Sequence, residues 1–332
     1  MAVNWETLLS VDATTIGSLF VSHRSKNAPK IDVRGFSIPF TGTQQRCEKL
    51  IQCLRRQLIK YVFPESQRPE DIDWAIARDK FGDNDPSSDG KLGEMLLYLF
   101  VEAYLNAPLM GFKLKDLGNP NDPVKGADGV FVGAYAGSPA ILIGESKIHQ
   151  TIASAVHSTL DSLQRFHDGS GPYTNELMIA RKYPAERGLS PETLKVVDDL
   201  LTGAVDRILV HPVFISYDCK EIANISQSSA TAPDAEKALE EYILSVSDTW
   251  MTTIDSHRST FVKPFQVYLD FFFLPCEDSL ALRNAFYEML HGHPYESGAV
   301  KAAVKRTQKD FKDKAKLPKV SVAVKSSRGK KT

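Results

Sequence analysis

Two short apolar runs separated by a turn-forming segment predict a β-hairpin near the middle of the chain. Residues 130–132 (Val-Phe-Val) and 140–143 (Ala-Ile-Leu-Ile) are typical of strands, and the glycine and proline within residues 134–139 mark a turn between them. Side chains alternate along a strand, so Ile143 lies on one face of the second strand and Leu142 on the other. Both faces are apolar, which predicts a buried strand.

A helix with two apolar stripes is predicted upstream, over residues 90–105, with Asp89 as its cap. At about 100° per residue its apolar side chains fall into two almost opposite stripes, and only Lys91 and Glu102 mark a clearly wet edge. Glu94 lies within the second stripe. A helix that is apolar on both sides is buried, and a carboxylate within it needs a partner or a metal ion. The first stripe is Leu92, Met95, Leu96, Leu99, Phe100 and Ala103, and the second is Leu97, Tyr98, Val101 and Leu105.

Strands and helices alternate along most of the chain, which predicts an α/β layer structure. We divide it into an N-terminal region (1–78) that forms a partner interface, a core (79–290) and a basic, partly disordered tail (291–332). Residues 149–166 read as an amphipathic helix. Its apolar face is Ile152, Val156, Thr159, Leu163 and Phe166. The other expected elements are an early helix, strands at 33–38, 207–217 and 265–274, and helices at 43–62, 233–250 and 279–290.

Charged side chains flank the predicted hairpin. A turn centred between residues 136 and 137 places Asp128 opposite Glu145, with Cβ atoms about 5 Å apart on one face. The period of two returns Lys147 to that face. Two like charges at this separation repel unless a cation or a proton lies between them. One interpretation is a site that holds a divalent metal and cuts a phosphodiester. The other is a solvated strand end with an incidental ion pair, because the acid-x-Lys pattern occurs four times in the chain.

Glu94 adds a third carboxylate, although a structural salt bridge would also explain a buried glutamate. In the order helix Glu, strand Asp, strand Glu-x-Lys, these segments resemble the core of PD-(D/E)XK nucleases. The local sequences Leu92-Gly93-Glu94, Gly126-Ala127-Asp128-Gly129 and Gly144-Glu145-Ser146-Lys147 also resemble the HamA family, the nuclease subunits of Hachiman antiphage defence systems. The resemblance is close over residues 79–166 and loose to about 288. Ala127 stands where the superfamily has a proline.

The resemblance implies a restriction-endonuclease-like α/β fold: a mixed central sheet flanked by helices, with an N-terminal α+β extension. It implies cleavage of DNA with Mg²⁺, for which Mn²⁺ can substitute. Asp128, Glu145 and the backbone carbonyl of Ser146 would bind the metal, and Glu94 would bind it directly or through water. Lys147 would stabilise the attacking hydroxide and the transition state. The implied partner is a helicase subunit similar to HamB.

Other polar residues offer further or rival sites. Gln150 and His157 are candidate substrate-binding residues, or simply the solvated face of their helix. Asp218-Cys219-Lys220 also follows an apolar strand, but no Gly-flanked aspartate strand precedes it, which favours an ordinary strand end. The acidic segment 83–90 resembles a calcium loop, but Leu96 stands where that loop needs a bidentate glutamate, so a polar capping loop is favoured.

Composition limits the class of protein. The chain has 332 residues, 42% hydrophobic and 24% charged, which is ordinary for a soluble globular protein. No apolar stretch approaches 18 residues and the N-terminus lacks a signal peptide's basic start, so a cytoplasmic prokaryotic protein without membrane contact is expected. The four cysteines show no paired metal spacing, which favours reduced thiols. Since no phosphate-binding loop occurs, any ATP hydrolysis belongs to another protein.

The net charge of −1 hides an asymmetry between the tail and the rest. Residues 299–332 contain 12 Lys or Arg and 2 Asp or Glu, so the remainder carries 28 basic and 39 acidic residues. A basic tail contacts phosphates or an acidic partner surface, or only improves solubility.

These observations predict a metal-dependent DNA nuclease that acts in a two-component defence system with a helicase. One alternative is a catalytically silent module that binds DNA or the partner and keeps the nuclease fold. Another is a hydrolase of small phosphorylated molecules, which would need a tight pocket.

Overall fold

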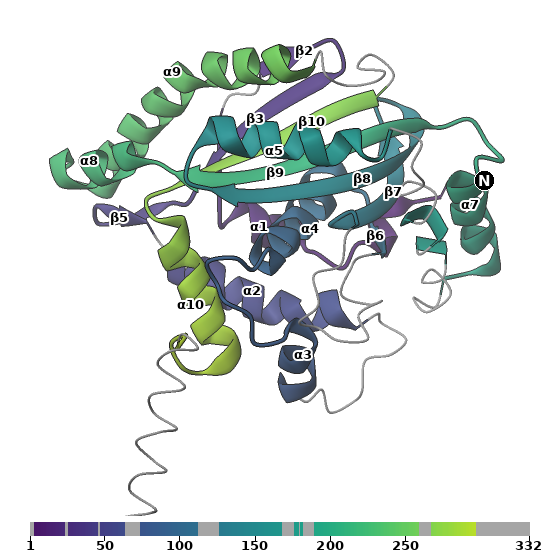
Figure 1. Cartoon of the computed structure of the whole chain (residues 1–332), viewed down its shortest axis with the longest axis horizontal. Helices are drawn as coiled ribbons and strands as arrows, with labels where there is room; N and C mark the ends of the chain where they lie inside the picture. Colours follow the sequence, from purple (N-terminus) through teal and green to yellow (C-terminus); the bar gives the residue numbers. More distant parts are fainter. Residues whose placement is uncertain are drawn as a thin grey trace, which may run out of the picture.

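A central mixed β-sheet organises the protein in the computed structural model (Figure 1). The structure describes residues 3–23, 26–45, 47–63, 74–111, 126–167, 176–178, 180–181, 189–258 and 267–296. Eight strands of this part form one sheet in the order β1-β3-β10-β9-β8-β7-β6, with β2 beside β3. The strands are β1 (Val21–Ser22), β2 (Lys26–Ala28), β3 (Ile31–Ser37), β6 (Leu109–Gly111), β7 (Gly129–Tyr135), β8 (Ser138–His149), β9 (Ile208–Asp218) and β10 (Val267–Cys276).

The middle of the sheet is parallel and its borders are antiparallel. β3, β10, β9 and β8 run in one direction, whereas β7 and β6 on one side and β1 and β2 on the other run against their neighbours. The short strands β4 (Phe40–Thr41) and β5 (Gln44–Gln45) form a separate antiparallel pair. Parallel strands need both faces covered, and their continuous apolar sequences are consistent with that.

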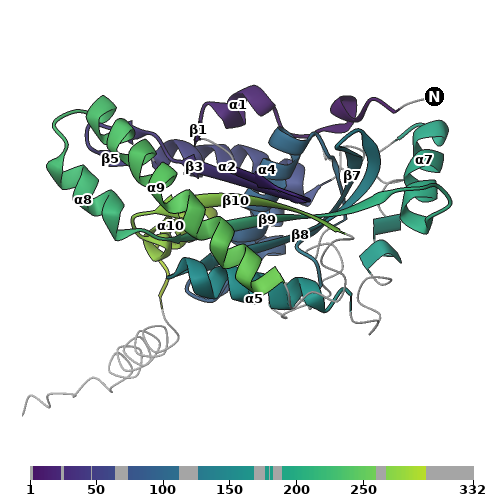
Figure 2. The same ribbon diagram turned by 90° about the horizontal axis from the view of Figure 1, so that it is seen from above.

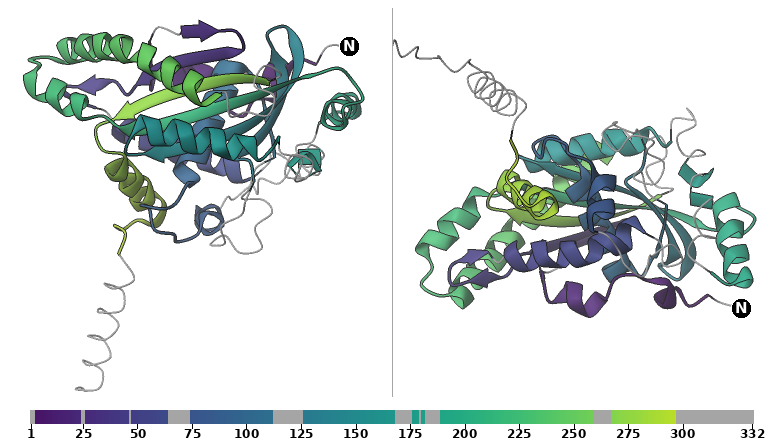
Figure 3. Two further views of the ribbon diagram at one scale, coloured as in Figure 1. Left: turned by 45° about the horizontal axis from the view of Figure 1, so that its top comes forward. Right: turned by 90° about the horizontal axis from the view of Figure 1, so that it is seen from below.

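Helices cover both faces of the sheet (Figure 2). One face packs against the helices α1, α2, α4 and α10, and the other against α5, α7, α8 and α9. The helix α10 also contacts α2, as Figure 3 shows from below. The helices are α1 (Ala13–Gly17), α2 (Cys47–Val62), α3 (Trp74–Phe81), α4 (Lys91–Leu105), α5 (Ile152–Gln164), α7 (Pro191–Thr202), α8 (Lys220–Ser228), α9 (Ala232–Arg258) and α10 (Ser279–His291), with a short 3-10 helix at Trp5–Leu8.

The expected fold class, a mixed central sheet flanked by helices, is confirmed. The hairpin β7–β8 forms with the predicted register, since Gly129 pairs with Gly144. Leu142 packs in the core on the α4 face and Ile143 in the core on the α5 face, so β8 is buried on both sides as expected. The predicted helix 149–166 begins only at Ile152, because the strand continues to His149.

Two other expectations are wrong in detail. The helix expected at 43–62 begins at Cys47, because residues 44–45 pair as β5. The wet edge expected on α4 is buried, with Lys91 7% and Glu102 0% exposed. The Glu102 carboxylate accepts hydrogen bonds from the backbone N–H groups of Ser10, Val11 and Leu109, at 2.7, 3.0 and 3.0 Å. These distant donors offset the desolvation of the charge.

The N-terminal residues share the central sheet and the cores on both sides. The strand β3 lies between β1 and β10 inside the sheet, and α2 buries Leu50, Leu54 and Leu58 in the core on the α4 face. The four cysteines are free thiols, as expected. No helix in the described ranges combines the length and apolarity needed to cross a bilayer. The basic tail lies outside the described residues from position 297 onward.

Candidate active site

The tight turn of the hairpin sets its register and brings two carboxylates to the same end of it. Ala136 and Gly137 have φ values of 49° and 78°, the left-handed conformation that a type I′ hairpin turn requires. The regular pairing ends at Gly129 and Gly144. Beyond it the backbone N–H of Asp128 donates to the carbonyl of Gly144 at 3.0 Å, one residue out of that register, so Asp128 departs from the expected position directly opposite Glu145.

Asp128 is held by the residue that follows Glu145. Its Oδ2 accepts hydrogen bonds from the backbone N–H of Ser146 at 2.7 Å and from the Ser146 hydroxyl at 2.6 Å. Asp128 is 5% and Glu145 3% exposed, so both carboxylates are buried at the end of the hairpin. Hydrogen bonds to an ionised carboxylate are among the stronger ones in proteins, and they fix the orientation of Asp128.

Lys147 points to the same side as Glu145 and forms an ion pair with it through Nζ and Oε1. The Lys147 side chain is 22% exposed and that of Glu145 5%. The strand period of two places the two side chains on one face, as the sequence predicts. A cation therefore offsets part of the negative charge that the two buried carboxylates concentrate here.

Gly93 brings the first turn of α4 against β8. A Cβ atom at this position would lie 2.9 Å from the Ser146 hydroxyl oxygen and 3.3 Å from its Cβ, so only glycine allows this approach. Gly144 faces α4 in the same way, since a Cβ there would meet the Leu97 side chain at 2.7 Å. Glu94, half-buried, is thereby carried on a helix turn that touches the strand bearing Glu145.

Tyr61 shows that Glu94 and Asp128 belong to one electrostatic cluster. Burial raises the pKa of the Tyr61 phenol well above its usual value, and the negative charges of Glu94 and Asp128 raise it further. The ring of Tyr61 packs against Tyr98 of α4, with centroids 5.1 Å apart. Glu94 and Asp128, which lie on different elements, therefore both act on the same buried phenol.

The donor set fits a hard cation with few protein ligands. In the described part of the chain, no three His, Cys, Asp or Glu side chains converge closely enough to hold a metal by themselves. Mg²⁺ does not need such a cage, since it is usually bound by one or two carboxylates and keeps several waters. Asp128 and Glu145, which are both buried at the end of the hairpin, match that requirement.

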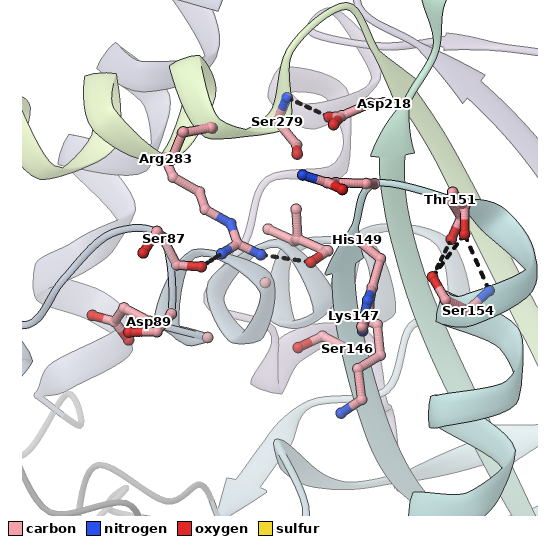
Figure 4. A pocket seen from close by; sticks show the side chains of 16 residues that line it. Ser87, Asp89, Ser146, Lys147, His149, Thr151, Ser154, Asp218, Ser279 and Arg283 are labelled. Atoms are coloured by element: carbon pink, nitrogen blue, oxygen red, sulfur yellow. Dashed lines mark hydrogen bonds between the residues drawn. The ribbon is translucent and has the colours of Figure 1, made fainter.

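A pocket opens directly beside these residues, with a volume of about 610 Å³ (Figure 4). It lies between the loop before α4, the end of β8, and the first turns of α5 and α10. Ser146 and Lys147 belong to its lining, whereas Glu94, Asp128 and Glu145 do not, so the pocket adjoins the strand segment that follows Glu145. Gln150 also lines it, whereas His157 does not. His157 lies further along α5, where its imidazole is 3.3 Å from the carboxylate of Asp161.

Arg283 of α10 joins the two segments that carry the cluster. Its guanidinium donates to the carbonyls of Pro86 and Ser87 at 3.2 and 2.7 Å, and to the carbonyl of Ile148 at 2.6 Å. The first two precede the helix that bears Glu94, and the third follows Lys147 (Figure 4). The sequence analysis did not single out Arg283, and only its place in the first two turns of a late helix could have drawn attention to it.

Glu176 is a second residue that the sequence analysis missed. It is 8% exposed, and a side chain in place of Gly126 would collide with its carboxylate. A fourth acidic group therefore lies next to the segment that leads into Asp128. Its local sequence, Thr-Asn-Glu-Leu, carries no pattern that distinguishes it from a surface glutamate.

Both rival segments have structural roles. The Oδ1 of Asp218 accepts the backbone N–H of Ser279 at 2.8 Å, which fixes the start of α10. In the acidic loop, Asp85 accepts the backbone N–H of Ser87 at 2.9 Å, and Asp83 accepts the hydroxyl of Tyr287. These contacts agree with an ordinary strand end and a polar loop.

The fold and the cluster define a mixed α/β protein with two buried carboxylates and a lysine at the end of a central hairpin. The model of the HamA family matches residues 15–290, most of the chain. The chain therefore belongs to the HamA family and is a component of Hachiman antiphage defence. Among curated proteins, none matches it.

Proposed function

We propose that the protein is a metal-dependent nuclease that hydrolyses the phosphodiester bonds of DNA, with Asp128, Glu145, Lys147 and Glu94 as its working residues. The observation that carries this proposal is that Asp128 and Glu145 are both buried at the end of the β7–β8 hairpin, where Ser146 donates two hydrogen bonds to Asp128 and Lys147 forms an ion pair with Glu145. Two buried carboxylates in this position are unfavourable for stability alone. Sites with such unfavourable charge arrangements are often functional.

The chain's own residues have distinct tasks in this proposal. Asp128, Glu145 and the carbonyl of Ser146 would hold Mg²⁺, or Mn²⁺ in its place, and Glu94 would bind directly or through water. When bound, such an ion lowers the pKa of a water molecule and neutralises charge on the scissile phosphate. The Lys147 ammonium, now paired with Glu145, would stabilise the attacking hydroxide and the charge that develops on the phosphate oxygens. The hydrogen bonds from Ser146 orient Asp128 for its task.

We further propose that the nuclease acts with a helicase subunit of the same defence system. Membership of the HamA family supports this assignment. The chain contains no phosphate-binding loop of the Walker type, so strand separation driven by ATP would fall to the partner.

A pair of matched variants tests the nuclease proposal. The double substitution Glu145→Ala with Lys147→Ala should abolish Mg²⁺-dependent cleavage of plasmid DNA, measured by gel assay with and without the proposed helicase subunit. The substitution Lys220→Ala is the control, since it removes the exposed lysine of a second acid-x-Lys triplet at the end of the neighbouring parallel strand. Full cleavage by a folded double variant would refute the assignment. A wild-type protein that binds DNA but never cuts it would instead identify a silent binding module.

A further inference from the structure

The pocket beside the carboxylate cluster has the size and position of a substrate subsite. Its volume of about 610 Å³ lies within the range of about 300–1,000 Å³ that is usual for sites of small organic ligands. Because Ser146 and Lys147 form one end of it, a phosphate at the cluster would leave the adjoining sugar and base facing the pocket. The pocket would thus receive one nucleotide of the strand being cut.

The charged side chains that line the pocket leave its interior suited to an uncharged group. Arg283 already donates to three backbone carbonyls. Asp89 accepts both the backbone N–H and the ammonium of Lys91, at 3.0 and 3.4 Å, and Asp218 accepts the N–H of Ser279. Lys147 lines one end of the pocket and forms an ion pair with Glu145. A phosphate is favoured at that end, whereas the body suits an uncharged ligand.

The remaining wall combines hydroxyl groups with flat or apolar surface. Ser87, Ser88, Thr151, Ser154 and Ser279 bring hydroxyl groups to the lining, and Gln150 brings an amide; such groups match the hydrogen-bonding edges of a base and the sugar oxygens. Burial lowers the pKa of His149, and the nearby cations Lys147 and Arg283 lower it further, which favours the uncharged imidazole. Leu280 is 47% exposed, a high value for a large apolar side chain, and it lines the same pocket.

We propose that this pocket binds one unpaired nucleoside of DNA next to the scissile phosphate, so that the substrate is single-stranded or locally opened DNA. The proposal rests on the nuclease function proposed above. A base within a duplex is stacked and paired and cannot enter such a pocket unless it leaves the helix. The imidazole of His149 and the side chain of Leu280 would contact the base, since stacking on flat or apolar side chains accepts every base.

Arg283 holds two walls of the pocket together. Its three hydrogen bonds tie the loop at Pro86–Ser87 to the strand end at Ile148, which are two walls of the pocket. Because these walls are already fixed, less conformational entropy of the loop and the strand end is lost when a ligand binds.

Binding is tested in the full chain carrying Glu145→Ala, which removes cleavage from the measurement. Ser154 is exposed on the pocket wall, so Ser154→Phe should fill the pocket while Thr151 still caps α5 through the backbone N–H of residue 154. The matched control is Ala153→Phe, an exposed neighbour on the same helix that does not line the pocket. Fluorescence anisotropy with a labelled dT₁₂ strand gives the Kd of each variant, and the thermal unfolding midpoint verifies its fold.

We expect Ser154→Phe to raise the Kd for dT₁₂ about tenfold, the scale of one lost base-stacking contact, and Ala153→Phe to leave it within about twofold. A single abasic residue scanned along the strand should weaken binding at one position, and Ser154→Phe should remove that sensitivity. Leu280→Ala, a truncation of an exposed side chain, should raise the Kd about threefold.

Equal affinities of Ser154→Phe and Ala153→Phe, with no sensitive abasic position, would overturn the pocket proposal. That result would leave the nuclease proposal intact if the wild-type protein cuts DNA with Mg²⁺. Conversely, a protein that never cuts but shows the expected binding pattern would refute the nuclease and keep the nucleoside pocket.

Discussion

Replacing His211 by asparagine should flatten the loss of stability that the protein undergoes on mild acidification. His211 of β9 is fully buried, and its Nδ1 lies 2.9 Å from the carbonyl oxygen of Ile143, two residues before Glu145. A carbonyl only accepts, so Nδ1 carries the proton. The other ring nitrogen, 2.9 Å from Nε2 of His167, therefore accepts a hydrogen bond from that residue. This arrangement requires a neutral His211 ring.

The size of this loss of stability follows from the lowered pKa of His211. Burial, with a smaller effect of His167, lowers the pKa of His211 to about 3, against 6.5 for an ordinary histidine. The unfolded chain therefore takes up a proton below pH 6.5 that the folded protein refuses until about pH 3. The stability is fully present above pH 6.5 and is lost as pH falls, by about 1.4 kcal/mol per pH unit. Between pH 7 and pH 5 the loss is about 2 kcal/mol.

Asp270 changes the stability with pH in the opposite direction to His211. The effect of His211 is therefore isolated by comparing the wild type with a His211 variant. Burial raises the pKa of its carboxyl to about 6 despite the bidentate ion pair with Arg34. The folded protein then binds this proton more readily than the unfolded chain, and stability rises as pH falls from about 6 to 4. Only the difference between the wild type and His211→Asn isolates the histidine.

Urea unfolding at pH 7, 6 and 5 measures that difference. An asparagine at position 211 retains a donor for the carbonyl of Ile143 but does not titrate. The stability of the His211→Asn variant should therefore fall by about 2 kcal/mol less than that of the wild type between pH 7 and pH 5. His157→Asn, at a largely exposed position, is the control and should behave as the wild type. Parallel curves for the wild type and His211→Asn would refute a neutral buried imidazole at this position.

Three further substitutions test a buried ion pair in the central sheet and two contacts at the candidate site. Arg34→Met leaves the buried Asp270 without its ion-pair partner and should lower the free energy of unfolding in urea at pH 8 by about 3–5 kcal/mol. Adding Asp270→Asn should recover part of the lost stability. No recovery would show that an unpaired charge on Asp270 is not the cause of the loss. Gly93→Ala should reduce the initial rate of DNA cleavage at least about tenfold, because the added Cβ displaces Ser146. This loss is expected although alanine favours a helix over glycine by about 1 kcal/mol. An unchanged rate would show that the close approach of α4 to Ser146 is unimportant for cleavage. Arg283→Lys should lower kcat for cleavage, since a point-like ammonium cannot match the planar fork that donates to three carbonyls; a wild-type kcat would remove its positioning role.

The sequence by itself determined the hairpin and the partners within it. Asp128, Glu145 and Lys147 lie within 20 residues of one another, and the period of two and the tight turn are local properties of the backbone. The same local rules located α4, α5, β9 and β10 to within a few residues, because their apolar patterns are long and regular.

Only the tertiary structure decided which distant residues complete the site. Arg283 reaches carbonyl groups more than 130 residues away in sequence, and Glu176 lies beside Gly126 without any local signal. Glu102 looked solvent-exposed from its helix position, yet three backbone N–H groups from outside α4 bury it. Patterns along a chain report local geometry, whereas the partner that satisfies a buried charge is set by packing between remote segments.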